Sequence, residues 1–294
     1  MNLRKHHEML LHFVMAFIGG YFGLYAIVAR NDLFGSAQTS NLIYLVQDIL
    51  GGRPLDFVLR IGALVLYSTA VVLSVWLPKH TAVNNKILSI LIDGGAVILL
   101  GFLPKDMNPV LGLYPIFFAM AFQWCSFKGI GGYNSATVFS TNNLRQFVSA
   151  VTLFADEKKQ EHLQKLKFYG GTLLSFHLGV GAACVAWQFF DVTSIWLCFL
   201  ALPAAFGLAV YEHSLTIEPE AIKNAINKNP SGVKTIFLIK FCSLHPGNMK
   251  GFFLCNGNET QEIVKPIGAH DFCFRRFIGM VCTRKPGIFH GCRR

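Results

Sequence analysis

Two short polar stretches, residues 31–41 and 131–143, hold the side chains best suited to bind a small polar solute. Amide and hydroxyl groups donate and accept hydrogen bonds without a net charge, so two facing clusters could replace a solute's hydration shell. Helix capping is a compatible interpretation, because Asn41 and Asn143 each stand just before an apolar segment, as N-cap residues do. A glutamine inside an apolar run could equally bond a neighbouring helix. The predicted substrate-binding residues are Gln38, Thr39, Asn41, Gln123, Thr141, Asn142 and Asn143.

Two ionisable residues inside apolar runs are the candidates for proton coupling. Asp93 lies where a carboxylate costs about 2.5–3.5 kcal/mol on insertion scales, so it is expected to face a cavity or a partner. The alternative is that Asp93 lies nearer the membrane interface and pairs with Lys86 or with a backbone donor. His177 lies midway along another apolar run, where its imidazole could relay protons or bond a neighbouring helix.

No arrangement of residues in the sequence predicts an enzyme. Ser36 has no adjacent His and Asp pair that would make it a nucleophile. The chain has no phosphate-binding P-loop and no glycine-rich dinucleotide fingerprint. The apolar part has no cluster of His and Glu that would hold a metal. We therefore expect no catalytic residue, no metal site and no cofactor.

The composition indicates an all-α integral membrane protein. Hydrophobic residues make up 53% of the chain and charged residues only 14%, whereas soluble domains average about 25% charged residues. Six apolar runs approach the length of about 20 residues that a spanning helix needs. Helices are expected because lipid cannot satisfy backbone polar groups. The six predicted spans are residues 9–29, 57–77, 87–103, 110–127, 169–190 and 193–211.

The distribution of Lys and Arg over the predicted loops sets the expected orientation. The N-terminus, the second loop, the fourth loop and the C-terminal tail carry most of these residues. An excess of Lys and Arg in short loops is typical of the cytoplasmic side. We therefore expect both termini to be cytoplasmic.

Two connections between the predicted spans are not ordinary loops. Each is a small polar stretch followed by an apolar segment, residues 42–50 and 144–154, that is too short to span. Such a segment is an interfacial helix or one arm of a re-entrant or broken helix.

The same two stretches suggest an internal repeat. A shift of 102 residues places Thr39 and Asn41 on Thr141 and Asn143. The chain then divides into halves at about 9–103 and 110–211, each with three spans, a polar motif and a short non-spanning helix. An odd number of spans makes the second half inverted. Inverted repeats are a common transporter architecture, with the site at the repeat interface.

These motifs resemble those of the bacterial YoaK family, six-helix inner-membrane proteins known as a domain of unknown function. The resemblance covers about residues 10–212, and it rests on the stretches 36–41, 118–123 and 141–144. It implies the fold and a location in the bacterial inner membrane, but no substrate.

The resemblance also has three departures. Gln38, Thr39 and Asn41 match the family's Gln-Thr-Gly-Asn motif, but Ser40 stands at the glycine, as Asn142 does in the second copy. Gly23 stands where family members often carry an acidic residue. An activity that depends on that acid would be lost or altered in this chain.

The C-terminal part, residues 216–294, differs from the rest. Residues 221–294 hold 12 of the 26 Lys and Arg residues but only three of the 16 Asp and Glu residues, so the basic excess lies there. Five cysteines are present without a regular helix or strand pattern, and we expect a disordered basic tail. Its charge favours contact with anionic lipid over nucleic acid.

The sequence thus predicts a small-solute transporter or permease in the lipid bilayer. The alternative is a non-transporting scaffold or assembly protein, in which the polar motifs only pack helices. The oligomeric state is left open.

Overall fold

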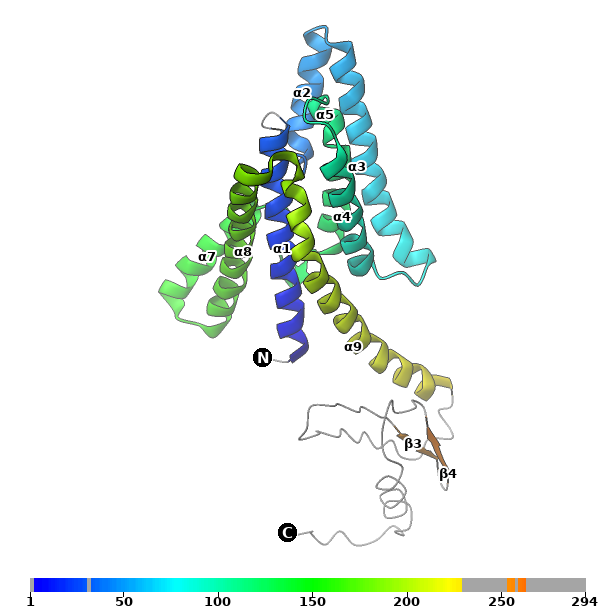
Figure 1. The fold of residues 1–294 in the computed structure, drawn as a ribbon. Helices are drawn as coiled ribbons and strands as arrows, with labels where there is room; N and C mark the ends of the chain where they lie inside the picture. Colours follow the sequence, from blue (N-terminus) through cyan, green and yellow to red (C-terminus); the bar gives the residue numbers. More distant parts are fainter. Residues whose placement is uncertain (1–2, 31–32, 229–252, 257–258, 263–294) are drawn as a thin grey trace. The chain divides into compact units, whose positions relative to one another are not determined.

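The computed structural model describes residues 3–30, 33–228, 253–256 and 259–262 of the 294-residue chain, and it describes the side chains of residues 5–30 and 33–215. Almost all of this part is helical (Figure 1). The helices are α1 (Leu3–Ala29), α2 (Gln38–Leu50), α3 (Pro54–His80), α4 (Asn85–Phe102), α5 (Pro109–Gly112), α6 (Tyr114–Ser126), α7 (Thr141–Glu157), α8 (Gln160–Phe190), the 3-10 helix η1 (Asp191–Leu200) and α9 (Leu202–Lys228).

Four helical stretches of the described part are long and apolar enough to cross a membrane: Lys5–Ala29, Pro54–His80, Asn85–Phe102 and Gln160–Leu215. The last stretch contains α8, η1 and the first part of α9, so it includes both the fifth and the sixth predicted spans. The predicted fourth span is divided between α5 and α6 at Leu113. The prediction of six spans therefore stays a prediction.

The outer face of α3 has the surface expected against lipid. Val58, Val65 and Val72 lie seven residues apart, which places them on one face of the helix, and their exposed fractions are 62%, 58% and 61%. Large apolar side chains are similarly exposed along α4 and α8. An apolar surface of this extent on several long helices is stable in a bilayer, so the chain is a multi-pass membrane protein.

Helix α1 packs closely along α8, and the crossing depends on glycine (Figure 1). A Cβ atom at Gly20 would overlap the carbonyl oxygen of Phe176, and one at Gly179 would overlap that of Phe17. The two backbones are therefore in contact, as in other small-residue crossings in membranes. Elsewhere in the bundle, α6 packs on α3 and α4, and Tyr114 Oη donates a hydrogen bond of 2.8 Å to the carbonyl oxygen of Leu59.

The shorter helices α2 and α7 each pack on the next helix along the chain, α3 and α8 respectively. They are 13 and 17 residues long, and each follows one of the two polar stretches. Their presence agrees with the short helices predicted after the motifs. Between α6 and α7, the strands β1 (Gly129–Ile130) and β2 (Tyr133–Asn134) form an antiparallel pair whose turn uses Gly131 and Gly132 with positive φ.

The contacts divide the chain into two compact units, Met1–Thr216 and Ile217–Arg294. In the second unit, strand β3 (Phe253–Asn256) pairs antiparallel with β4 (Glu259–Glu262), beyond the end of α9. This strand pair differs from the expectation of a wholly irregular tail. Residues 216–228 of the predicted disordered tail are helical as well, because they form the last part of α9. The other residues of the tail, with its proposed lipid contact, lie outside the described residues.

Candidate functional site

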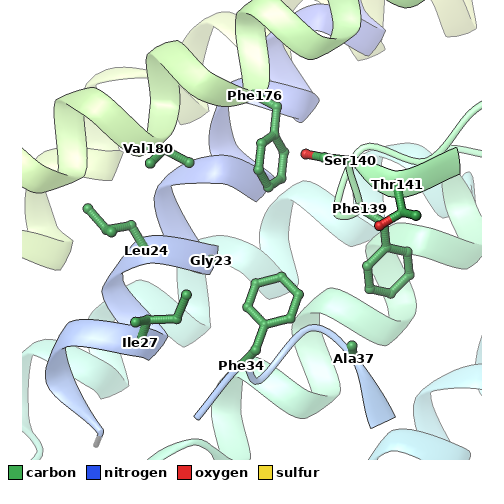
Figure 2. Close-up of a pocket in the computed structure, with 10 residues that line it drawn as sticks. All are labelled: Gly23, Leu24, Ile27, Phe34, Ala37, Phe139, Ser140, Thr141, Phe176 and Val180. Atoms are coloured by element: carbon green, nitrogen blue, oxygen red, sulfur yellow. The ribbon is translucent and has the colours of Figure 1, made fainter. Parts of the chain in front are cut away.

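A pocket of about 390 Å³ lies where the two polar stretches meet α1 and α8 (Figure 2). Helix α1 supplies one wall, α8 another, and the starts of α2 and α7 complete it. Ala37 immediately precedes α2, while Ser140 and Thr141 stand at the start of α7. The lining residues are Gly23, Leu24, Ile27, Phe34, Ala37, Phe139, Ser140, Thr141, Phe176 and Val180.

Gly23 on α1 forms part of the pocket wall. A Cβ atom there would lie 3.1 Å from a ring atom of Phe34 and 3.7 Å from one of Phe176. The glycine therefore lets these two rings approach the helix, and a larger side chain would enter the space between them.

The second polar stretch is organised around the buried side chain of Asn143. Its amide nitrogen donates to the carbonyl oxygens of Ala136 at 2.7 Å and Phe139 at 3.0 Å. Its Oδ1 accepts from the hydroxyl of Ser135 at 2.9 Å, and that hydroxyl also lies 2.9 Å from Nε2 of His12 on α1. Because the single hydroxyl hydrogen goes to Asn143, Nε2 of His12 carries the hydrogen of the second bond. This network fixes the loop before α7 against α1.

The first stretch is held by a buried ion pair that the sequence did not reveal. Nε of Arg60 on α3 lies 2.7 Å from Oδ2 of Asp48 on α2, and Nη1 of Arg60 donates to Oδ1 of Asn41 at 3.4 Å. The Asp48 carboxylate also pairs with Nη2 of Arg53 at 2.6 Å. Asn41 donates in turn to Oε1 of Gln38 at 2.9 Å. This network fixes α2 on α3.

The capping interpretation of Asn41 and Asn143 is wrong. The N-cap residues are Ala37 and Ser140, and both asparagines lie inside their helices. Asn143 bonds the loop that precedes its helix, and Asn41 bonds α3. The apolar run begins one residue after each asparagine, but the helix begins earlier, because the polar motif already forms its first turn.

Gln123 on α6 is fully buried and has a structural role. Its Nε2 donates to the carbonyl oxygen of Met15 and to Oγ1 of Thr137, each at 2.9 Å. It therefore connects α6 to α1 and to the loop before α7. It does not line the pocket.

Asp93 and His177 occupy contrasting environments. Asp93 on α4 is fully buried, and within the described part of the chain neither carboxyl oxygen has a hydrogen-bond partner. The alternative pairing with Lys86 is not found, because Lys86 Nζ lies 2.6 Å from Oε1 of Glu212. His177 is exposed on α8, and its Nδ1 lies 2.8 Å from the carbonyl oxygen of Leu173 in the same helix.

Of the predicted binding residues, Thr141 lines the pocket and Gln38 follows the lining residue Ala37. Thr39 is exposed, and Asn142 bonds the backbone of Asn134 and the side chain of Arg145. The lining residues that sequence analysis missed are mostly apolar. Three of them adjoin the motifs, and this position could have indicated them: Ala37, Phe139 and Ser140. Nothing in the sequence marks three others as pocket residues: Phe34, Phe176 and Val180.

The chain was compared with known protein families, curated proteins and solved structures. No curated protein and no solved structure matches it. The family model DUF1275, described as a protein of unknown function, matches residues 11–208, a range that includes both polar motifs and the whole pocket. The chain therefore belongs to the DUF1275 family, which includes YoaK.

Proposed function

We propose that this protein transports a small solute through the pocket between the two polar motifs. The observation that carries the proposal is that the starts of both short helices line one pocket. A pocket lined by helix starts and by long helices resembles the sites of many transporters with broken helices. The proposal involves movement of a solute and no chemical reaction.

The packing of the helices supports two inverted halves. In the first half α1 is followed by α2 and α3, and in the second α6 is followed by α7 and α8. Helix α1 packs on α8, and α6 packs on α3. The first helix of each half therefore contacts the third helix of the other half. The pocket lining follows this relation, because the 102-residue shift places Ala37 on Phe139.

Side-chain contacts at the two ends of α4 support six crossings. At one end Lys86 pairs with Glu212, and beyond the other end Lys105 pairs with Asp191. The segment 191–212, which consists of η1 and the first turns of α9, therefore covers the same distance as α4. Likewise α5 and α6 run from Gly112, which contacts Arg30, to Phe127, which contacts Lys86. On this basis α1, α3, α4, α5–α6, α8 and η1–α9 would each cross once.

We place the protein in the bacterial inner membrane with both termini in the cytoplasm, in keeping with its family and with the distribution of Lys and Arg. Asp93 is the residue proposed to couple protons, because an unpaired buried carboxyl group can be held neutral and exchange a proton only when water reaches it. His177 is a weaker candidate, since it is exposed on the outside of α8.

The test is solute uptake into proteoliposomes that contain the full chain, measured over a broad panel of solutes. Val180→Trp fills the pocket and should abolish uptake. Val185→Trp makes the same substitution on the same helix at a position that is 58% exposed, and it should leave uptake unchanged. Asp93→Asn should remove the dependence of uptake on a proton gradient. Absence of uptake by the folded wild type would refute transport, and equal uptake by both tryptophan variants would refute transport through this pocket.

The second candidate function is a membrane scaffold or assembly protein. It is favoured by the hydrogen bonds of three buried amides, which are made to the protein's own backbone: those of Asn41, Asn143 and Gln123. A scaffold would have a partner that co-purifies in fixed stoichiometry and dissociates when an exposed helix face is changed. Its function would be unaffected by filling the pocket with Val180→Trp.

A further inference from the structure

The chemistry of the pocket restricts the class of solute. Eight of its ten lining residues have no polar side-chain atom. Figure 2 shows the rings of Phe34, Phe139 and Phe176 around the open space, with Leu24 and Ile27 on the side away from Ser140. A strongly polar solute would lose its water here and find few partners, which is unfavourable. Aromatic and aliphatic walls instead favour an apolar body.

One corner of the pocket is polar. The hydroxyl of Ser140 is buried, lies on the pocket side in Figure 2, and has no hydrogen-bond partner within the described part of the chain. The carbonyl oxygen of Ser140 is already used, because it accepts from the backbone of Leu144 at 2.8 Å. The neighbouring Thr141 adds a second hydroxyl. A ligand that bonds this hydroxyl would give it the partner that it lacks in the described part of the chain.

From this geometry we infer that the pocket binds a small, mainly apolar solute with a single hydrogen-bonding group directed at Ser140. The inference rests on the proposed function and names the class of solute for it. It replaces the polar solute that the motifs alone led us to expect. The polar residues of the motifs mostly hold the surrounding helices and loops in place, whereas the apolar residues beside them line the pocket.

A lipid acyl chain is the competing occupant, since the pocket is in a membrane protein. An acyl chain would fit the apolar walls, but it would leave the hydroxyl of Ser140 unpaired. The volume of about 390 Å³ is in the range of small-molecule sites, near its lower end. The polar corner therefore favours a solute over a chain.

The experiment measures binding to the full chain in lipid nanodiscs by calorimetry, with empty nanodiscs as the blank. The probes are benzamide, which has a ring and an amide, acetamide, which has the amide alone, and toluene, which has the ring alone. Benzamide should bind at least tenfold more tightly than acetamide. Val180→Trp should abolish the binding of benzamide, and Val185→Trp should preserve it.

Ser140→Ala separates the polar corner from the apolar walls. It should weaken benzamide by about 5- to 10-fold, the usual effect of losing one neutral hydrogen bond, and leave toluene unchanged. The ring of Trp124 lies 5.4 Å from that of Phe139, so the fluorescence of this tryptophan gives a second readout, which Trp124→Phe should remove.

Equal affinity for acetamide and benzamide would overturn the inference, as would binding that survives Val180→Trp or that equals the empty-nanodisc blank. A failure of the transport proposal gives a different result from a failure of this inference. If benzamide binds as expected but no solute enters proteoliposomes, the pocket assignment stands and the transporter proposal fails. If a polar solute is transported and Val180→Trp blocks it, while benzamide does not bind, transport stands and this inference fails.

Discussion

At the scale of single residues, the polar motifs are mainly the framework of the site. Asn143 uses both ends of its amide to hold a loop, and Ser135 extends that network to His12. In a membrane protein such bonds have no water to replace them, so a buried amide must find its partners inside the protein. The asparagine therefore fixes the shape of the pocket without lining it.

Asn143→Ala should destabilise the protein by about 2–4 kcal/mol. The substitution leaves the two backbone groups of Ala136 without their partner, and each buried unpaired group costs about 1–3 kcal/mol; it also removes one of the two bonds of the Ser135 hydroxyl. The measurement is the free energy of unfolding in mixed micelles. Asn142→Ala is the matched control, since this neighbour is only partly buried and should change stability by less than about 1 kcal/mol. Equal losses in the two variants would contradict the assignment.

The residue scale also explains what could and could not be predicted from the sequence. Residue type and position identified the motifs and the short helices after them, because polar clusters in apolar sequence are conspicuous. The pocket lining was missed, since Phe34 and Phe176 are ordinary apolar residues in an apolar chain. Asp48 and Arg60 are 12 residues apart, and only the packing of α2 on α3 makes them partners.

At the scale of elements, two devices hold the helices that surround the pocket. The α1–α8 crossing is held by close backbone contact, and α2 is held on α3 by the ion pair of Asp48 with Arg60. The first depends on shape and the second on charge. They can therefore be tested independently, because changes at distant sites are expected to be additive.

Gly179→Ala should weaken the α1–α8 crossing. The added methyl group would overlap the carbonyl oxygen of Phe17, so the helices must separate, at a cost of about 1–3 kcal/mol. Gly181→Ala, two residues along the same helix, meets nothing within 4 Å and should be neutral or stabilise by up to about 1 kcal/mol. Thermal unfolding of both variants in detergent would measure the difference. The crossing is not tight if the two substitutions behave alike.

Removal of one partner of the buried ion pair should cost more than removal of both. Arg60→Met leaves the Asp48 carboxylate, whose side chain is fully buried, with only the more exposed Arg53, and a loss of about 3–5 kcal/mol is expected. In the double variant Asp48→Leu with Arg60→Met, no buried charge is left unpaired, because Arg53, which also loses its partner, is about half exposed. A double-mutant cycle of unfolding free energies measures the coupling. Additive losses would mean that the two side chains do not interact.

At the scale of the whole molecule, the number of crossings decides whether the proposed halves are inverted. Composition predicted apolar runs well, because lipid selects long apolar sequence. It could not predict the break at Leu113, which follows the Asn108 cap of α5 and precedes Pro115 at the start of α6. Helices α5 and α6 together extend about 27 Å at 1.5 Å per residue, close to the thickness of a hydrocarbon core of about 30 Å.

We therefore expect the segment from α5 to α6 to cross the membrane despite its break. In a variant without the native cysteines, Asp106→Cys precedes this segment and Lys128→Cys follows it, and both positions are exposed. A membrane-impermeant thiol reagent should label Asp106→Cys from outside intact cells, and Lys128→Cys only after permeabilisation. Labelling of both positions from the same side would mean that the segment is re-entrant. The two halves would then have unequal numbers of crossings, and the inverted repeat would be ruled out.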